Sequence, residues 1–340
     1  MSHEKLRVAI HGAGWVAGAH VRAWLKNPHV EVVSISDVDL GRAEQFARTN
    51  NLSCQVRDRY DEVLADDRVD VVDIASPSHV HAQQAIAAAG AGKHLLVEKP
   101  MALTMDENIA LRDAVARAGV KSITSFVCRF NEQVITLKSL IQAGAIGELF
   151  YAEVDYWHGI KPSHHAWQLH SRKQTGGSAM LLGGCHALDT LRWLVGDEVE
   201  QVTAYANNRK GLFEYDANVV AVLKFRGGAI AKASVLFDCE MPYAMNVDIA
   251  GTGGTLRDNR IYSRNLFPGQ TGWTTFPTVM LDSGDVMHHG FGREIDHLVE
   301  CIHEDREPHC NVADAFRTHE LCFAIDRSIE LGRPVELPLE

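Results

Sequence analysis

The sequence predicts an α/β protein of two domains, the first a doubly wound parallel sheet and the second an α+β domain with a large, mostly antiparallel open sheet. Within residues 1–126, apolar runs typical of buried strands alternate with stretches of helical length, as in βαβ units. After residue 127, strand-like segments follow one another without intervening helices. A chain of 340 residues also exceeds one ordinary core, so we place the domains at 1–126 and 127–340.

The elements of the first domain follow from hydrophobic periodicity and capping signals. Thr104 followed by Glu107 is typical of a capping box at a helix start, and Gly119 is typical of a helix end. Strands are expected over residues 6–10, 30–36, 69–74, 94–97 and 122–126, and helices over 15–26, 40–49, 80–91 and 105–118.

The second domain has a different order of elements. Gly227-Gly228 separates two strand-like runs and is typical of a hairpin turn. We expect helices over residues 132–143, 177–194, 293–303 and 312–330, and strands over 149–157, 219–225, 229–237 and 245–250.

Composition argues against several classes of protein. The formal net charge of −11 argues against binding to nucleic acid or to an anionic membrane, and no run approaches the ~18 apolar residues of a membrane span. Residues 1–7 lead straight into a strand-like run, so we expect a cytoplasmic protein. The seven cysteines form no CxxC pair, which predicts reduced thiols. The histidine and cysteine clusters lack a zinc spacing, so no metal is expected.

The strongest local motif is Gly12-x-Gly14-x-x-Ala17, which follows the first predicted strand and opens the first predicted helix. The first glycine permits a tight turn, the second lets the backbone approach a pyrophosphate, and a small third residue lets helix and strand pack closely. The helix N-terminus adds unpaired N–H groups and a partial positive charge. With its strand and helix in place, the motif predicts a dinucleotide-binding Rossmann domain.

Asp37 ends the second predicted strand, about 20 residues beyond the glycine loop, where a carboxylate binds the adenosine ribose. A carboxylate there repels a 2′-phosphate, which favours NAD, although Arg42 could accommodate NADP. The alternative is that Asp37 only caps the following helix. The turn at residues 76–79 follows the strand at 69–74, so we expect it to line the nicotinamide side, although Ser78 could equally serve as a helix cap.

Residues 94–100 read His-Leu-Leu-Val-Glu-Lys-Pro and place Lys99 at the end of a predicted strand. Ligands of open α/β sheets bind at the carboxyl ends of the strands, so Lys99 is a candidate proton-handling group beside the nicotinamide. The alternative is an ion pair between Lys99 and a carboxylate such as Glu98.

Together these motifs resemble the Gfo/Idh/MocA family of glucose–fructose oxidoreductases and inositol dehydrogenases. The resemblance continues through His20, Arg129-Phe130-Asn131, residues 144–148 and residues 176–189. It implies a Rossmann domain, a second domain whose open sheet serves substrate enclosure and oligomerisation, and sugar, inositol or polyol substrates. We therefore expect a homodimer or homotetramer that binds a small carbohydrate or polyol. The motifs and the resemblance assign the cofactor to Gly12, Gly14, Trp15, Val16, Asp37, Arg42, Ser76, Pro77, His79, His81, Glu98 and Lys99.

The resemblance also implies catalytic roles for Lys99 and His186, which match the lysine and histidine that family members use. Family members often carry an aspartate four residues before that histidine, where this chain has Leu182. We expect Asp189, three residues after His186, to be the partner of His186 in place of that aspartate. The alternative is that Asp189 is a helix-surface or subunit-contact carboxylate. We expect His186 to take the proton of the substrate hydroxyl and Lys99 to stabilise the negative charge on its oxygen. The alternative is that His186 is only a hydrogen-bonded histidine of the helix.

Residues 155–175 crowd aromatic, histidine and basic side chains into one stretch that we expect to select the substrate, unless it is only a polar loop. The expected substrate-binding residues are Lys99, Arg129, Trp157, His158, His165, Trp167, His170, Arg172 and His186.

The expected function is therefore hydride transfer between NAD(P) and a secondary alcohol of a sugar, inositol, polyol or glycoside. One alternative is a redox-neutral enzyme that recycles its NAD during glycoside cleavage, epimerisation or paired oxidoreduction. Another is a non-catalytic nucleotide or sugar sensor, since one fold can serve several functions. The presence of both Lys99 and His186 argues against the sensor.

Overall fold

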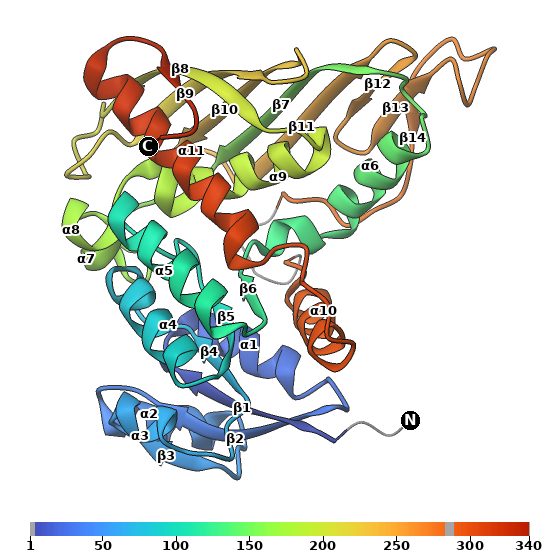
Figure 1. Ribbon diagram of the computed structural model, residues 1–340. Helices are drawn as coiled ribbons and strands as arrows, with labels where there is room; N and C mark the ends of the chain where they lie inside the picture. The colour runs from blue at the N-terminus through green and yellow to red at the C-terminus, as the bar shows by residue number, and fades with distance from the viewer. Residues whose placement is uncertain (1–3, 283–288, 340) are drawn as a thin grey trace. The chain divides into compact units, whose positions relative to one another are not determined.

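The computed structural model describes residues 4–282 and 289–339, which divide into two compact units (Figure 1). One unit comprises Met1–Phe126 with Phe291–Arg317, and the other comprises Val127–Gly290 with Thr318–Glu340. Residues 291–317 fall within the predicted second domain, 127–340. The structure instead groups this segment with the first unit, because helix α10 (Phe291–His303) packs on helix α1 (Trp15–Trp24).

The first unit contains a six-stranded sheet in which every neighbouring pair of strands is parallel. The spatial order is β3-β2-β1-β4-β5-β6, so the strand order reverses between β1 and β4. This confirms the predicted doubly wound α/β fold, and it places the topological switch point where ligands bind in such sheets. The strands are β1 (Leu6–His11), β2 (Val30–Ser36), β3 (Gln55–Arg57), β4 (Val71–Ile74), β5 (His94–Val97) and β6 (Ser122–Thr124).

The helices of this unit begin and end near the expected residues. Thr104 Oγ1 accepts a hydrogen bond from Glu107 N at 3.2 Å and the Glu107 side chain accepts one from Thr104 N, so the capping box is confirmed. Helices α4 and α5 pack beside each other on one face of the sheet, and α1 lies on the other (Figure 1). The remaining helices are α2 (Leu40–Thr49), α3 (Tyr60–Leu64), η1 (Ser78–Val80), α4 (His81–Gly90) and α5 (Met105–Ala118).

The second unit is built on a nine-stranded sheet in the order β14-β13-β12-β11-β7-β10-β9-β8-β15. The pairs are antiparallel except β7 with β10, so the prediction of a mostly antiparallel open sheet is confirmed. The strands are β7 (Leu149–Trp157), β8 (Val199–Asn207), β9 (Asn218–Phe225), β10 (Ile230–Leu236), β11 (Ala244–Gly251), β12 (Gly254–Arg257), β13 (Arg260–Ser263), β14 (Thr274–Thr275) and β15 (Val335–Glu336).

Helix α9 (Cys185–Val195) packs against β7 and β10 on one face of this sheet (Figure 1). The expected helix at 177–194 starts later, because a π-helical turn (η3, Met180–Gly184) precedes α9. A Cβ on Gly183 would lie 2.7 Å from the Tyr156 ring, so glycine permits this close approach to the sheet. The other helices are η2 (Val127–Phe130), α6 (Glu132–Gln142), α7 (Trp167–His170), α8 (Lys173–Gly176) and α11 (Val312–Leu331).

The opposite face of this sheet carries exposed apolar side chains on β8, β9 and β10. Tyr205 is 80% exposed, and Val222 and Ile230 are each more than half exposed. Among residues 4–282 and 289–339, no helix is both long enough and apolar enough to cross a bilayer.

Candidate nucleotide and substrate sites

The glycine loop lies at the switch point between β1 and β4. Gly12 has φ +103°, and a Cβ there would come within 2.6 Å of the backbone of Ala75 and Ser76 at the end of β4. Both its conformation and its contacts therefore require glycine. By contrast, a Cβ on Gly14 would meet nothing within 4 Å, so the loop leaves open space at that position.

The N-terminus of α1 opens directly from this loop. Gly14 is the N-cap and forms no side-chain cap, and the first turn carries no acidic residue. The side chains of the helix therefore do not neutralise its N-terminal partial charge, which fits a dinucleotide pyrophosphate. Trp15 and Val16 lie in the same turn, and Trp15 is 52% exposed.

Asp37 is a buried carboxylate held beside the loop. One oxygen accepts a hydrogen bond from Ala13 N at 2.9 Å, and the other accepts one from Asp39 N at 3.0 Å. The exposed Arg42 guanidinium lies 3.5 Å from Asp37. The alternative that Asp37 caps α2 is wrong, because the cap is Asp39, whose side chain accepts from Arg42 N.

A series of hydrogen-bonded polar side chains at this edge of the sheet was not expected from the sequence. His11 Nδ1 lies 2.8 Å from Ser36 Oγ, and His11 Nε2 lies 2.9 Å from the side-chain amide of Gln84. Gln84 Oε1 in turn accepts from Ser76 Oγ at 2.5 Å. This series therefore joins the carboxyl ends of β1, β2 and β4. The sign of this arrangement in the sequence is His11, which directly precedes Gly12.

The buried His11 ring provides a test of this arrangement through pH. Burial lowers the pKa of His11 from 6.5 to about 4. Because the pKa of His11 is lower in the folded than in the unfolded protein, the neutral ring contributes fully to the free energy of unfolding above pH 6.5. This contribution is lost as the pH falls toward 4. We expect the free energy of unfolding to fall by up to about 3 kcal/mol over this range from His11 alone.

The measurement is a set of urea unfolding curves at pH 7, 6, 5 and 4.5 for the wild type and for His11→Asn. The variant should lose less stability than the wild type on acidification. His29→Asn, at an exposed position, is the matched control. Equal pH slopes in His11→Asn and the wild type would contradict the prediction.

Lys99 lies in a turn that is held from two sides. Its N–H donates to Glu98 Oε2 at 3.0 Å, while the next residue, Pro100, has its carbonyl oxygen 2.8 Å from His81 Nδ1. The other ring nitrogen of His81 lies 2.7 Å from the Ser76 carbonyl oxygen. His81 therefore joins the Ser76 turn to the Lys99 turn. Lys99 is half-buried, whereas Pro77 and His79 in the Ser76 turn are exposed.

In the second unit, His186 is buried on α9 and stacks on Tyr156, with ring centroids 5.8 Å apart and an interplanar angle of 19°. The Tyr156 hydroxyl lies 3.3 Å from His158 Nδ1. Burial raises the pKa of Tyr156, so this hydroxyl keeps its proton. Leu182, in the position where the family often has aspartate, is buried in the π-helical turn.

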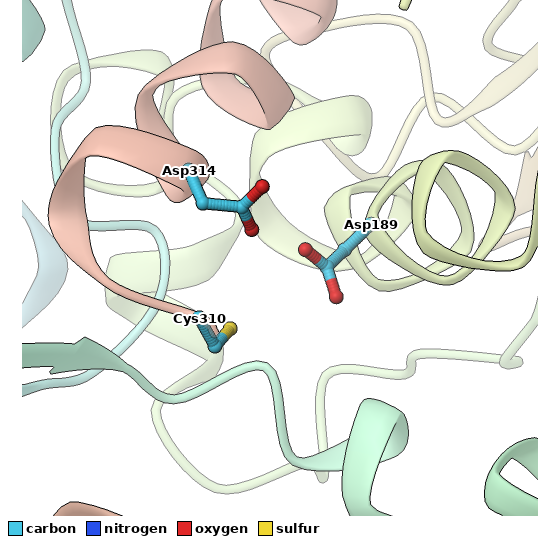
Figure 2. A group of neighbouring side chains, drawn as sticks. All are labelled: Asp189, Cys310 and Asp314. Carbon is cyan, nitrogen blue, oxygen red and sulfur yellow. The ribbon is translucent and has the colours of Figure 1, made fainter. Parts of the chain in front are cut away.

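Asp189 projects from α9 (Figure 2). Its carboxylate contacts the guanidinium of Arg129. Arg129 Nε donates to Asp189 Oδ2 at 2.9 Å, its terminal nitrogen pairs with Oδ1, and both residues are at most 2% exposed. Thr318 Oγ1 lies 3.3 Å from Asp189 Oδ1. Asp189 and Arg129 are therefore a buried ion pair, an arrangement that is not predicted from the sequence. Figure 2 also labels Cys310 and Asp314, which lie around the N-terminal end of α11 in the first unit.

The predicted substrate segment contains a cluster of histidine rings. His158 and His164 have ring centroids 5.6 Å apart, and His165 and His170 have centroids 6.3 Å apart. Trp167 packs against Phe213. Arg172 is exposed and precedes α8.

Trp157 lies apart from that cluster. Successive strand residues face opposite sides of a sheet, so Trp157 faces away from the side on which Tyr156 stacks with His186. Its indole N–H donates to Ser234 Oγ at 2.9 Å, in a network with Asp155 and Lys232. The structure therefore does not bring Trp157 together with His186.

Comparison with known proteins bears on both units. Two family models match the chain, "oxidoreductase family, NAD-binding Rossmann fold" over residues 6–126 and "oxidoreductase family, C-terminal alpha/beta domain" over residues 138–337. The scyllo-inositol 2-dehydrogenase (NAD(+)) of Bacillus subtilis (strain 168) is 26% identical over 346 residues, covering 100% of this chain and 98% of that protein.

Two further similarities involve levoglucosan dehydrogenase. The enzyme of Pseudarthrobacter phenanthrenivorans is 32% identical over 282 residues, covering 78% of this chain and 70% of that protein. A solved structure of levoglucosan dehydrogenase in complex with NADH and L-sorbose has a TM-score of 0.90 at 24% identity, covering 99% of this chain and 100% of that one. The structural similarity shows the fold.

Proposed function

The chain belongs to the Gfo/Idh/MocA oxidoreductase family, and on that premise we propose that it is an NAD-dependent dehydrogenase of a secondary alcohol in a cyclic polyol or sugar. The observation that carries the proposal lies in the first unit. His81 contacts both the Ser76 carbonyl, at the switch point, and the Pro100 carbonyl, in the Lys99 turn. A potential proton-handling lysine is thus tied to the strand end that borders the glycine loop.

NAD would be held by the Gly12–Gly14 loop, the N-terminus of α1 and Asp37, and when bound it supplies the hydride acceptor. The open space at Gly14 and the absence of acidic residues in the first turn of α1 support this assignment. Asp37, fixed by two main-chain N–H groups, would accept hydrogen bonds from the adenosine ribose hydroxyls and repel a 2′-phosphate.

Lys99 and His186 are the residues that we assign to the substrate hydroxyl. Lys99 would donate a hydrogen bond to the oxygen and stabilise the negative charge that develops on it. His186 would accept the hydroxyl proton as general base, a role in which imidazole side chains act in many enzymes. The stack on Tyr156 fixes the plane of the His186 ring, a positioning role that would offset the absence of an aspartate at Leu182.

A cyclic polyol or anhydrosugar is the substrate class that we favour. The named relatives act on scyllo-inositol and levoglucosan, as their names state. The histidine cluster of His158, His164, His165 and His170 would hydrogen-bond several ring hydroxyls. Arg129 is left out of this set because it is buried against Asp189, and Trp157 because it faces the other side of the sheet.

The experiment is NADH fluorescence from the purified protein supplied with NAD and a panel of inositols, anhydrosugars, aldoses, sugar acids and glycosides. We expect reduction of NAD with one class of cyclic polyol or sugar, and a weaker signal with NADP. Turnover of a glycoside or epimer without net reduction of NAD would instead establish the redox-neutral alternative. Binding of NAD with no conversion of any compound would count against both enzyme assignments.

The exposed face of β8, β9 and β10 supports a homodimer or homotetramer in solution. On this face the exposed apolar side chains lie among charged ones, since Val222 pairs with Lys232 and Ile230 with Lys224. Exposed apolar side chains on a sheet are stabilised when a second copy covers them, and closed symmetric assemblies are the usual result. We expect light scattering after size-exclusion chromatography to give at least twice the 37.5 kDa mass of the chain at micromolar concentration. Val222→Lys should shift the protein toward monomer, whereas Val38→Lys, at an exposed valine of the first unit, should not. A monomeric wild type would contradict the prediction.

A further inference from the structure

The interior of the first unit contains a cluster of four ionisable side chains from four segments. His20 lies on α1, Asp73 on β4, Glu98 just after β5 and Glu294 on α10, and each is at most 6% exposed. Of these four, only Glu98 was among the residues that the sequence analysis assigned to a site. Groups of this kind are seldom fully buried without a pairing partner.

The two ring nitrogens of His20 both face carboxylates. His20 Nδ1 lies 2.9 and 3.0 Å from the two oxygens of Asp73, and His20 Nε2 lies 3.1 Å from Glu98 Oε1. A neutral imidazole has one N–H and one lone pair, so one nitrogen would face a carboxylate with its lone pair. Two N–H donors, and therefore the imidazolium, satisfy both contacts.

The contacts of Glu98 extend from His20 to Lys99. Its Oε1 contacts His20, and its Oε2 accepts the N–H of Lys99 at 3.0 Å. Asp73 is held separately, because it also accepts the indole N–H of Trp24 at 2.7 Å. Hydrogen bonds therefore connect α1, which opens from the glycine loop, to the backbone of Lys99.

The charges in the cluster agree with this geometry. Burial alone would lower the pKa of His20, but its contacts with Asp73 and Glu98 raise it well above 6.5. Burial alone would raise the pKa of Glu98, but the hydrogen bond and charge of His20, together with Lys99 and His81, lower it to about 2. Burial raises the pKa of Glu294 well above 4.5 and so favours its neutral carboxyl form, whose Oε2 accepts a hydrogen bond from Ser125 Oγ at 3.1 Å.

We propose that His20 is a positioning residue for the reaction: as an imidazolium it fixes the Glu98 carboxylate, and Glu98 fixes the main chain of Lys99. The proposal rests on the proposed function in so far as Lys99 acts on the substrate. Without the imidazolium, Asp73 and Glu98 are two buried carboxylates with no cation between them, and Glu98 loses the contact that orients it. Lys99 then departs from its productive position, although the nucleotide loop is intact.

The first test is steady-state kinetics of His20→Gln with saturating NAD and the substrate found in the panel. We expect kcat to fall by about 30-fold, with KM and the Kd for NAD within about threefold of the wild type. Glu294→Gln is the matched control, since it replaces a protonated carboxyl by a neutral amide in the same cluster, and its kcat should stay within about twofold. A wild-type kcat in His20→Gln would overturn the proposal.

A second pair of variants separates positioning from a general structural role. Glu98→Gln removes the charge that contacts both His20 and Lys99, whereas Asp73→Asn keeps the connection His20–Glu98–Lys99 and leaves a balanced ion pair. We expect kcat to fall at least tenfold further in Glu98→Gln than in Asp73→Asn. Equal losses in the two variants would mean that the cluster serves folding alone, and this comparison remains decisive if His20→Gln does not fold.

A direct measurement of the protonation state requires no activity. In protein labelled with ¹⁵N-histidine, both ring nitrogens of His20 should carry protons at pH 8. Their signals are assigned by their absence in His20→Gln or, if that variant does not fold, by the change that Asp73→Asn causes in them. A neutral ring at pH 8 would overturn the proposal even if Lys99 proves essential. Conversely, full activity of Lys99→Met would overturn the role of Lys99 in the proposed function and leave the imidazolium assignment standing.

Discussion

Replacing Lys99 by methionine is expected to lower kcat on the order of 10³-fold while leaving the Kd for NAD within about threefold of the wild type. Methionine keeps the length and much of the volume of the side chain, but it removes the charge and the hydrogen-bond donor. The contacts that hold the turn come from the Lys99 N–H and the Pro100 carbonyl, so they survive the substitution. The loss should therefore lie in the chemical step.

The measurement is steady-state production of NADH, with NAD affinity from quenching of intrinsic tryptophan fluorescence. Lys26→Met, an exposed lysine in the same unit, is the matched control and should keep wild-type kinetics. A kcat above about a tenth of the wild-type value in Lys99→Met would show that Lys99 does not stabilise the reacting oxygen. A loss confined to the Kd for NAD would make it a cofactor-binding residue instead.

Replacing Gly12 by alanine is expected to destabilise the first unit by about 3 kcal/mol or more. The residue has φ +103°, a conformation that alanine rarely adopts, and the added Cβ would come within 2.6 Å of backbone atoms of Ala75 and Ser76. Ala75 directly follows β4 and its N–H donates to His11 O at 2.8 Å, so these backbone atoms cannot move aside without disturbing the end of the pairing of β1 with β4. Urea unfolding at neutral pH measures this loss.

Replacing Gly14 by alanine is the matched control and separates the two glycines by role. Gly14 has φ −83°, and its Cβ would meet no atom within 4 Å, so the stability of the unliganded protein should change by less than about 0.5 kcal/mol. The affinity for NAD should nevertheless fall at least tenfold, because the Cβ would occupy the space that we assign to the pyrophosphate. Similar stability losses in the two variants would contradict this division.

Several features of the fold could be predicted from the sequence because they depend on residues close together in the chain. The glycine loop, the capping box at Thr104 and the alternation of strands and helices each occupy a short window. The strand β7 was predicted at its observed bounds for the same reason. The three-residue strand β3 was missed, since so short a segment shows no periodicity.

Parts of the candidate site could not be predicted, because they depend on contacts between distant segments. His11 meets Gln84 across 73 positions of the chain, and His20 meets Glu98 across 78. In sequence, Arg129 and Asp189 gave no sign of pairing, and Asp189 was assigned to His186 from helical spacing alone. Spacing places two side chains on one side of a helix, but it does not say which neighbouring element each contacts.

The sequence by itself determined the α/β class, the dinucleotide-binding loop and the strand end that carries Lys99, because backbone conformation and hydrophobic periodicity are local properties. The tertiary structure alone decided that α10 groups with the first unit, that His20 lies between two carboxylates and that Asp189 pairs with Arg129. Charged groups are buried only where a partner from another segment compensates them, and such a partner is identified only when the chain is folded.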